Sequence, residues 1–229
     1  MENLIAKVLF GEKIWLLADK AILWPSQGYL IVADVHLGKA THFSRNGSPL
    51  PPGKGRDDID KLKQLCLQHD VRKLLILGDL FHSEINSEFQ LLDALTETGD
   101  LKVELVAGNH DVIERRHFLD MGITVYETAF TRGPFEFVHD PLRPVAGNTE
   151  YRIGGHVHPG VRLYGKAKQS LKVPCFAFRK DHAVLPAFGS LTGQHEVKFD
   201  TDEDEIYAIA AGKVVKVPSP FRNVPSPAR

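Results

Sequence analysis

Five short clusters of aspartate, histidine and asparagine stand out in the sequence, because these side chains bind divalent metal ions and move protons. They provide carboxylates, imidazoles and one amide oxygen but no thiolate. This donor set suits Mn²⁺, Fe²⁺ or Zn²⁺ and argues against a closed structural zinc site. Seven candidate ligands exceed what one ion needs, so they indicate two ions that share a carboxylate. The candidates are Asp34, His36, Asp79, Asn109, His139, His156 and His158.

Each cluster directly follows a short apolar run of the kind found in strands that are buried on both faces. Open α/β sheets bind ligands at the carboxyl ends of their strands, so the five clusters should converge. Between the runs, apolar residues at helical spacing predict helices, and this alternation predicts an α/β fold. The runs cover residues 29–33, 74–77, 103–107, 135–138 and 151–153, and the helical patterns cover 59–65, 89–95 and 113–121.

The two ends of the chain have a different character. The start predicts a β-hairpin with a turn at Gly11-Glu12, and the C-terminal third predicts a second hairpin closed near Ala211-Gly212. We therefore predict one domain over residues 1–217, followed by a flexible proline-rich tail at 218–229. The strands expected in these regions cover residues 8–10, 14–17, 21–24, 175–179, 184–188, 206–210 and 214–217.

The composition is that of a globular protein, with 43% hydrophobic and 25% charged residues and no apolar run near the roughly 20 residues of a membrane span. Charged residues interrupt the N-terminus, and Cys66 and Cys175 form no metal or redox spacing. We therefore expect a cytoplasmic protein that does not enter a membrane. The net charge of −1 creates no field that attracts a polyanion, so such a partner must be held locally.

The order of the clusters resembles that of the calcineurin-like metallophosphoesterase superfamily, from about residue 29 to residue 160. The resemblance implies a two-sheet β-sandwich flanked by helices. It also implies two ligand sets that share Asp79 as a bridge: Asp34, His36 and His158 for one ion, and Asn109, His139 and His156 for the other. His110 would then be the outer acid that faces the substrate.

The chemistry of such a site also follows from its residue types. A hydroxide that bridges two cations is a nucleophile at neutral pH, and the same ions neutralise charge on the phosphoryl oxygens. The leaving oxygen still needs a proton, and His110, next to the ligand Asn109, is placed to provide one. Asp111 either orients His110 or caps its loop.

Four segments resemble more closely the small bacterial phosphoesterases of the ligase-associated DNA-damage-response type. They cover residues 33–39, 47–51, 78–83 and 185–193. This resemblance implies a manganese-dependent endonuclease that acts on single-stranded DNA in repair. It also implies a functional association with a DNA ligase, a helicase and an exonuclease-like protein.

Several residues beside the clusters are candidates for substrate contacts. The basic side chains after the first cluster could hold phosphates, and two phenylalanines could stack on bases. His82 either contacts the substrate or orients a metal ligand. The basic candidates are Lys39, Arg45, Lys54 and Arg56, and the aromatic ones are Phe43 and Phe81.

Two other functions fit the same sequence. The first is a phosphatase or phosphodiesterase for small nucleotides, because a dinuclear centre hydrolyses many esters and a fold does not fix a substrate. A deep closed pocket would favour it, whereas an open basic groove would favour DNA. The second is a non-catalytic protein-binding scaffold, which the complete set of ligands and His110 argue against.

Overall fold

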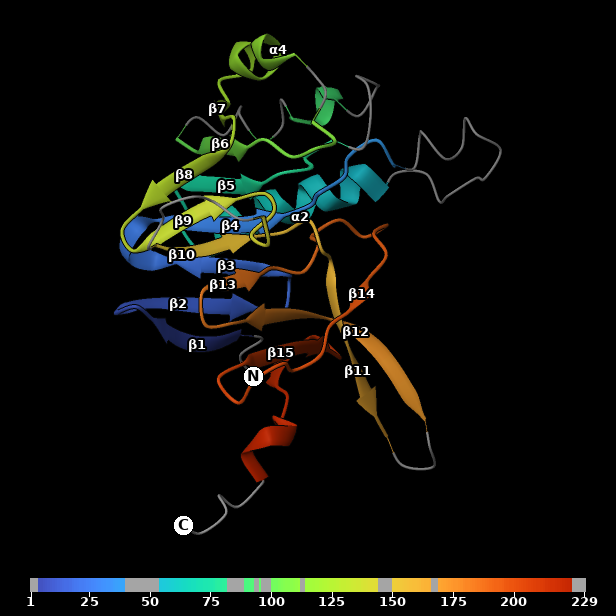
Figure 1. Ribbon diagram of the computed structural model, residues 1–229. Helices are drawn as coiled ribbons and strands as arrows, with labels where there is room; N and C mark the ends of the chain where they lie inside the picture. Colours follow the sequence, from blue (N-terminus) through green and yellow to red (C-terminus); the bar gives the residue numbers. More distant parts are fainter. Residues whose placement is uncertain are drawn as a thin grey trace.

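The fold is a sandwich of two β-sheets, seen in a computed structural model that describes residues 4–39, 54–81, 89–92, 95, 100–111, 114–143, 150–165 and 169–223 (Figure 1). The first sheet is formed by the N-terminal half of the chain and the second by the C-terminal half. The predicted α/β two-sheet architecture is therefore confirmed.

The first sheet has seven strands in sequence order, antiparallel from β1 to β4 and parallel from β4 to β7. Helix α2 (Lys54–Gln68) connects β4 to β5, and helix α4 (Arg115–Asp120) connects β6 to β7. Because β4 to β6 are parallel, their carboxyl ends lie at one edge. The strands are β1 (Leu4–Leu9), β2 (Glu12–Leu17), β3 (Ala21–Trp24), β4 (Tyr29–Ala33), β5 (Lys73–Leu77), β6 (Lys102–Val106) and β7 (Thr124–Tyr126).

The second sheet runs in the order β14-β11-β12-β13-β10-β9-β8, with the hairpin β15–β16 joined to β12. Its central strand β10 is parallel to both β9 and β13, so β9 and β10 also end at one edge. The strands are β8 (Ala129–Arg132), β9 (Phe135–Val138), β10 (Tyr151–Gly154), β11 (Pro159–Tyr164), β12 (Ser170–Phe178), β13 (His182–Val184), β14 (His195–Glu196), β15 (Glu205–Ala210) and β16 (Lys213–Lys216).

Strand β4 shows why the apolar runs in the sequence are continuous. Its side chains alternate between two hydrophobic cores. Ile31 joins Phe137 and Phe176 in the core between the sheets, whereas Leu30 joins Leu62 of α2 in the core beneath the helices. A strand that is covered on both faces has no place for a polar side chain until it ends.

Most of the predicted elements are present, including both terminal hairpins. The run at 184–188 is an exception, since regular pairing stops at Val184 and only a single bridge, from Ala187 to Ala33, follows. Pro186 explains the early stop, because proline has no N–H to donate to a neighbouring strand. The helix expected at 89–95 is described only as a 3-10 turn, η2 (Phe89–Leu92), and residue 95.

The segment after β16 begins with an ordered turn. Ser219 is buried, and Pro220–Asn223 form the short 3-10 helix η4. The flexibility expected for the tail at 218–229 stays a prediction, as does the single-domain boundary at 217. Within the described part of the chain, no helix combines the length and the apolar character that a membrane crossing requires.

Glu205 ties the first strand to the last hairpin, and its removal should destabilise the fold. Lys7 on β1 and Lys216 on β16 both donate hydrogen bonds to its carboxylate. Burial raises the pKa of Glu205, but the bonds from Lys216 and Lys7 outweigh it and lower the pKa from 4.5 to about 2. Because the folded-state pKa is the lower one, this stabilisation is full above pH 4.5 and is lost as the pH falls towards 2.

We expect Glu205→Gln to lower the free energy of unfolding by about 1 kcal/mol at pH 7, since the carboxylate is partly exposed. Urea unfolding at pH 7 and at pH 3.5 tests this, with a smaller difference expected at the lower pH. Glu203→Gln is the matched control, because Glu203 is exposed two residues away. An equal loss from both variants would show that the lysine contacts contribute nothing specific.

Candidate metal centre

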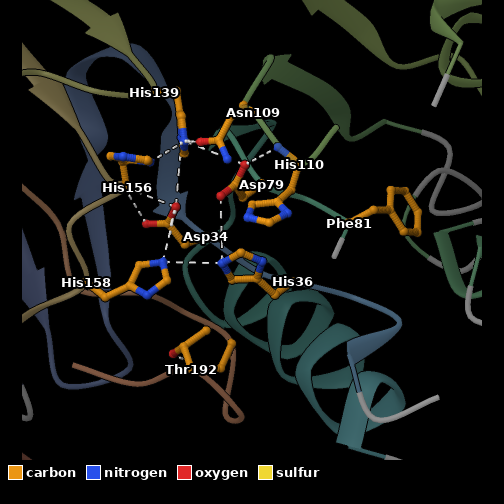
Figure 2. Close-up of polar contacts among 12 residues, drawn as sticks. Asp34, His36, Asp79, Phe81, Asn109, His110, His139, His156, His158 and Thr192 are labelled. Atoms are coloured by element: carbon orange, nitrogen blue, oxygen red, sulfur yellow. Dashed lines mark hydrogen bonds and ion pairs between the residues drawn. The ribbon is translucent and has the colours of Figure 1, made fainter. Parts of the chain in front are cut away.

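The first three polar clusters meet at the carboxyl edge of the first sheet. Beyond the paired strands β4 and β5, the backbone remains side by side: His36 N donates to the carbonyl of Asp79 at 2.9 Å, and Leu37 N donates to that of Leu80 at 2.9 Å. This extension places the side chains of Asp34, His36 and Asp79 within one small volume (Figure 2).

The second sheet brings its histidines to the same place. Gly155 N, after β10, donates to the carbonyl of His139, after β9, at 2.9 Å. His156 N donates to both carboxylate oxygens of Asp34, at 3.1 and 2.9 Å, which connects the two sheets directly. The convergence that was predicted from strand ends is therefore what the structure contains.

One ligand cluster consists of Asp34, His36 and His158, whose candidate ligand atoms all lie within 4.8 Å of one another. The two Nε2 atoms of His36 and His158 are 3.2 Å apart, and His158 Nε2 is 3.6 Å from Asp34 Oδ1. The carboxylate is fully buried, and burial raises the pKa of Asp34. A buried carboxylate faced by two imidazoles fits a divalent cation, which would favour its ionised form.

The second cluster consists of Asp79, His139 and His156, again with ligand atoms within 4.8 Å. His156 Nδ1 lies 3.0 Å from His139 Nε2, and Asn109 Oδ1 lies 2.9 Å from the same His139 nitrogen. Figure 2 shows the side chains of His139, His156 and Asn109 pointing towards one another, above Asp34 and Asp79. Oxygen and imidazole donors of this kind fit a second divalent ion.

Asp79, a member of the second cluster, also faces the first cluster. Its Oδ2 is 3.8 Å from His36 Nε2, and its Oδ1 is 3.5 Å from His139 Nε2. Each oxygen therefore faces a histidine of a different cluster. This is the position that a carboxylate shared by two ions requires.

The backbone of the site is strained. Five of the seven candidate ligands, all non-glycine residues, have positive φ angles between 47° and 67°. Each such conformation costs on the order of 1 kcal/mol and persists only where the surroundings impose it. The five residues are Asp34, His36, Asp79, His156 and His158.

Gly155 is a position where the site leaves no room for a side chain. A β carbon there would lie 2.3 Å from Asp34 Oδ2 and 2.6 Å from the β carbon of Ala33. We expect Gly155→Ala to displace the Asp34 carboxylate and to weaken metal binding at least about tenfold, as overpacking does in a dense interior. Titration calorimetry of the metal-free protein with Mn²⁺ measures this effect.

Gly193→Ala is the matched control, because a β carbon at Gly193 would meet nothing within 4 Å and no positive φ is involved. Unchanged metal affinity in Gly155→Ala would mean that metal binding does not depend on the present position of the Asp34 carboxylate.

His110 lies beside both clusters. Its backbone N donates to Asp79 Oδ1 at 2.9 Å, and its ring is 5.6 Å from the ring of His36, at 75°. It is half-buried, and the neighbouring Asn109 is exposed, so this side of the site faces solvent. The ring can therefore approach a substrate bound at the clusters.

The carboxylate of Asp111 connects the loop after β6 to the segment after β5 through hydrogen bonds. One carboxylate oxygen accepts the N–H of Gly108 at 2.9 Å, and the other accepts the N–H of Phe81 at 3.1 Å. Burial raises its pKa to about 6, against the effect of these two bonds. The geometry favours the loop-capping interpretation of Asp111 over direct orientation of His110.

The predicted substrate contacts are only partly described. Lys39 is half-buried after β4, and Arg56 is exposed in the first turn of α2. Arg45, His82, Phe43 and the side chain of Lys54 lie outside the described residues. Phe81 is fully buried and packs 6.0 Å from Phe118, so it belongs to the core and cannot stack on a base.

Asp58 supports the site in a way that the sequence did not reveal. It is buried on α2, and its Oδ2 accepts hydrogen bonds from both N and Oγ of Ser190, at 3.0 and 3.1 Å. The adjacent Gly189 N donates to the carbonyl of Asp34 at 3.1 Å. In the sequence Asp58 was an ordinary acidic residue at a helix start, and nothing local connects it to a residue 132 positions away.

Comparison with known proteins places these observations in context. The family model of calcineurin-like phosphoesterases matches residues 29–212. A nuclease from Pseudomonas putida, MPE, has a solved structure that is similar over 94% of this chain and 100% of its own, with 31% identity and a TM-score of 0.79. Yfce, a phosphoesterase from E. coli, is similar over 82% of this chain and 97% of its own, with 14% identity and a TM-score of 0.46. A comparison with curated protein sequences found no match.

Proposed function

The chain belongs to the calcineurin-like phosphoesterase family, and on that basis we propose that it is a manganese-dependent endonuclease that cleaves single-stranded DNA in DNA repair. The observation that carries this proposal is its 31% identity, across 94% of the chain, to a Pseudomonas putida nuclease. The two ligand clusters and the solvent-facing His110 support it.

The proposed assignment of ligands comes from the family resemblance, and the geometry of the two clusters is compatible with it. Asp34, His36 and His158 would hold one ion, with Asp79 as the bridge. Asn109, His139 and His156 would hold the other. Such ions, when bound, lower the pKa of water towards neutrality and offset the negative charge of a phosphate. Manganese is proposed from the resemblance to the ligase-associated phosphoesterases, because oxygen and imidazole donors without a thiolate suit Mn²⁺, Fe²⁺ and Zn²⁺ alike.

His110 would act on the leaving group. As the bond between phosphorus and the leaving oxygen breaks, that oxygen gains negative charge, and a proton from the imidazole neutralises it. The ring is suited to this because it lies beside both clusters and belongs to neither. Asp111 would act indirectly, by fixing the loop that carries His110.

Incubation of the metal-free protein with a labelled single-stranded oligonucleotide, with and without Mn²⁺, tests the proposal. The same samples should be assayed with a small phosphodiester such as bis(p-nitrophenyl) phosphate. We expect internal cuts that depend on Mn²⁺, and fewer cuts in an annealed duplex.

The alternatives give different results. An intact strand together with rapid hydrolysis of small esters would indicate an enzyme for small nucleotides. Inactivity on both substrates with two ions bound would indicate a binding scaffold. A cytoplasmic location and functional association with a DNA ligase, a helicase and an exonuclease-like protein stay predictions.

A further inference from the structure

The hairpin formed by β11 and β12 projects away from the sandwich, towards the lower right in Figure 1. The two strands pair in antiparallel fashion, with Arg162 opposite Lys172 and Tyr164 opposite Ser170. Strand β11 begins at Pro159, the residue directly after the candidate ligand His158. The hairpin is therefore a direct continuation of the site.

Strand β14 fixes the base of the hairpin to the metal centre. His195 N donates to the carbonyl of His158 at 2.9 Å, and Val197 N donates to that of Gly160 at 2.8 Å. From Pro159 to Tyr164 an extended strand covers about 17 Å. A surface of that length can follow several units of a polymer beyond the one that is cleaved.

The hairpin carries a net positive charge. Among the described residues of β11, β12 and β14, the cations are Arg162 and Lys172, and the anion is Glu196. Arg162 pairs with Glu196 at 2.8 Å, and Lys172 donates to the carbonyl of Gln194 at 2.8 Å. Hydrogen bonding to Arg162, together with the charges of Lys198 and Lys172, lowers the pKa of Glu196. One carboxylate cannot neutralise both cations of the hairpin, so the hairpin attracts anions, whereas the segment that contains Lys198 also carries Asp200, Asp202 and Glu203 and is acidic.

An aromatic ring stands beyond the two cations of the hairpin. Tyr164 has 78% of its surface exposed, far more than a tyrosine needs for its hydroxyl to reach water. It lies two residues after Arg162 and therefore on the same face of the strand. Cations followed by an exposed ring form an arrangement that binds single-stranded nucleic acid, because phosphates meet the cations and a base stacks on the ring.

We propose that the β11–β12 hairpin binds the part of a DNA single strand that extends beyond the metal centre, with phosphates at Lys172 and Arg162 and a base on Tyr164. This inference rests on the proposed nuclease function. Its consequence is that affinity for a long strand depends on the hairpin, whereas hydrolysis of a small ester does not.

Binding of a fluorescent single-stranded 20-mer, measured by anisotropy, tests the hairpin directly. The measurement uses the metal-loaded full chain with His110→Ala, so that the strand stays intact. We expect Arg162→Gln with Lys172→Gln to weaken binding about tenfold at 0.1 M salt and to make the salt dependence shallower, because fewer counterions are released. Tyr164→Ala should weaken binding at least about fivefold, and Tyr164→Phe should bind normally, since the ring remains.

The control is the double variant Lys63→Gln and Lys102→Gln, which removes the same charge from the pocket at the opposite edge of the first sheet. Equal losses in both double variants, or unchanged binding in the hairpin variants, would overturn the proposal. So would a matching fall in hydrolysis of the small ester by hairpin variants that retain His110, since the hairpin would then only support the metal centre. If the wild-type protein hydrolyses the small ester but leaves DNA intact and unbound, the nuclease function itself fails.

Discussion

Replacing Asp79 with asparagine should lower phosphodiester hydrolysis by at least about a hundredfold, and it should also reduce the number of bound metal ions. The carboxylate faces His36 through one oxygen and His139 through the other. An amide keeps the shape but loses the charge, and its nitrogen cannot donate a lone pair to a cation. Both clusters are therefore weakened by a single substitution.

Metal content after dialysis against Mn²⁺, measured by elemental analysis, is the first readout, and the rate of bis(p-nitrophenyl) phosphate hydrolysis is the second. Asp140→Asn is the matched control, because Asp140 is adjacent to the candidate ligand His139 but is engaged by Leu142 N and Arg143. An Asp79→Asn protein with two ions per chain and normal turnover would disprove the bridging role.

His110→Ala should reduce the cleavage of single-stranded DNA by about 10²-fold to 10⁴-fold while the bound metal is unchanged. The reason is that the leaving oxygen of DNA is strongly basic and needs a proton. The p-nitrophenolate leaving group is stable as an anion, so hydrolysis of the small ester should fall much less. The ratio of the two rate losses distinguishes proton donation from a general loss of structure.

His117→Ala on helix α4 serves as the control for this variant, because His117 lies on another element, away from the clusters. Equal losses on both substrates in His110→Ala would contradict proton donation and would favour a role in binding the phosphate.

The sequence was sufficient to predict where the ligands would gather. Each cluster follows a continuous apolar run, and the ends of parallel strands meet at an edge, so local pattern and general topology together placed Asp34, Asp79 and His139 in one region. The sequence pattern did not assign each histidine to one of the two clusters; that assignment had another source. It came from the resemblance, and the structure's geometry is compatible with it.

Other features depended on contacts that no local pattern contains. The bond between Asp58 and Ser190 joins residues from opposite halves of the chain. Strands β11 and β14 were not predicted, because β14 is only two residues long and β11 carries mixed polar and apolar side chains. Phe81 was considered as a stacking residue because its position beside Asp79 is visible in the sequence, whereas its burial against Phe118 is not.

The division of each ligand cluster between the two sheets affects the protein while it is being made. The first sheet supplies Asp34, His36 and Asp79, but His156 and His158 arrive only with the second sheet. A chain whose synthesis stops before residue 156 lacks at least one histidine of each cluster. Unfinished polypeptides and proteolytic fragments from either half therefore cannot assemble a centre alone. For an enzyme proposed to cut DNA, the full set of candidate ligands is therefore present only when both sheets are.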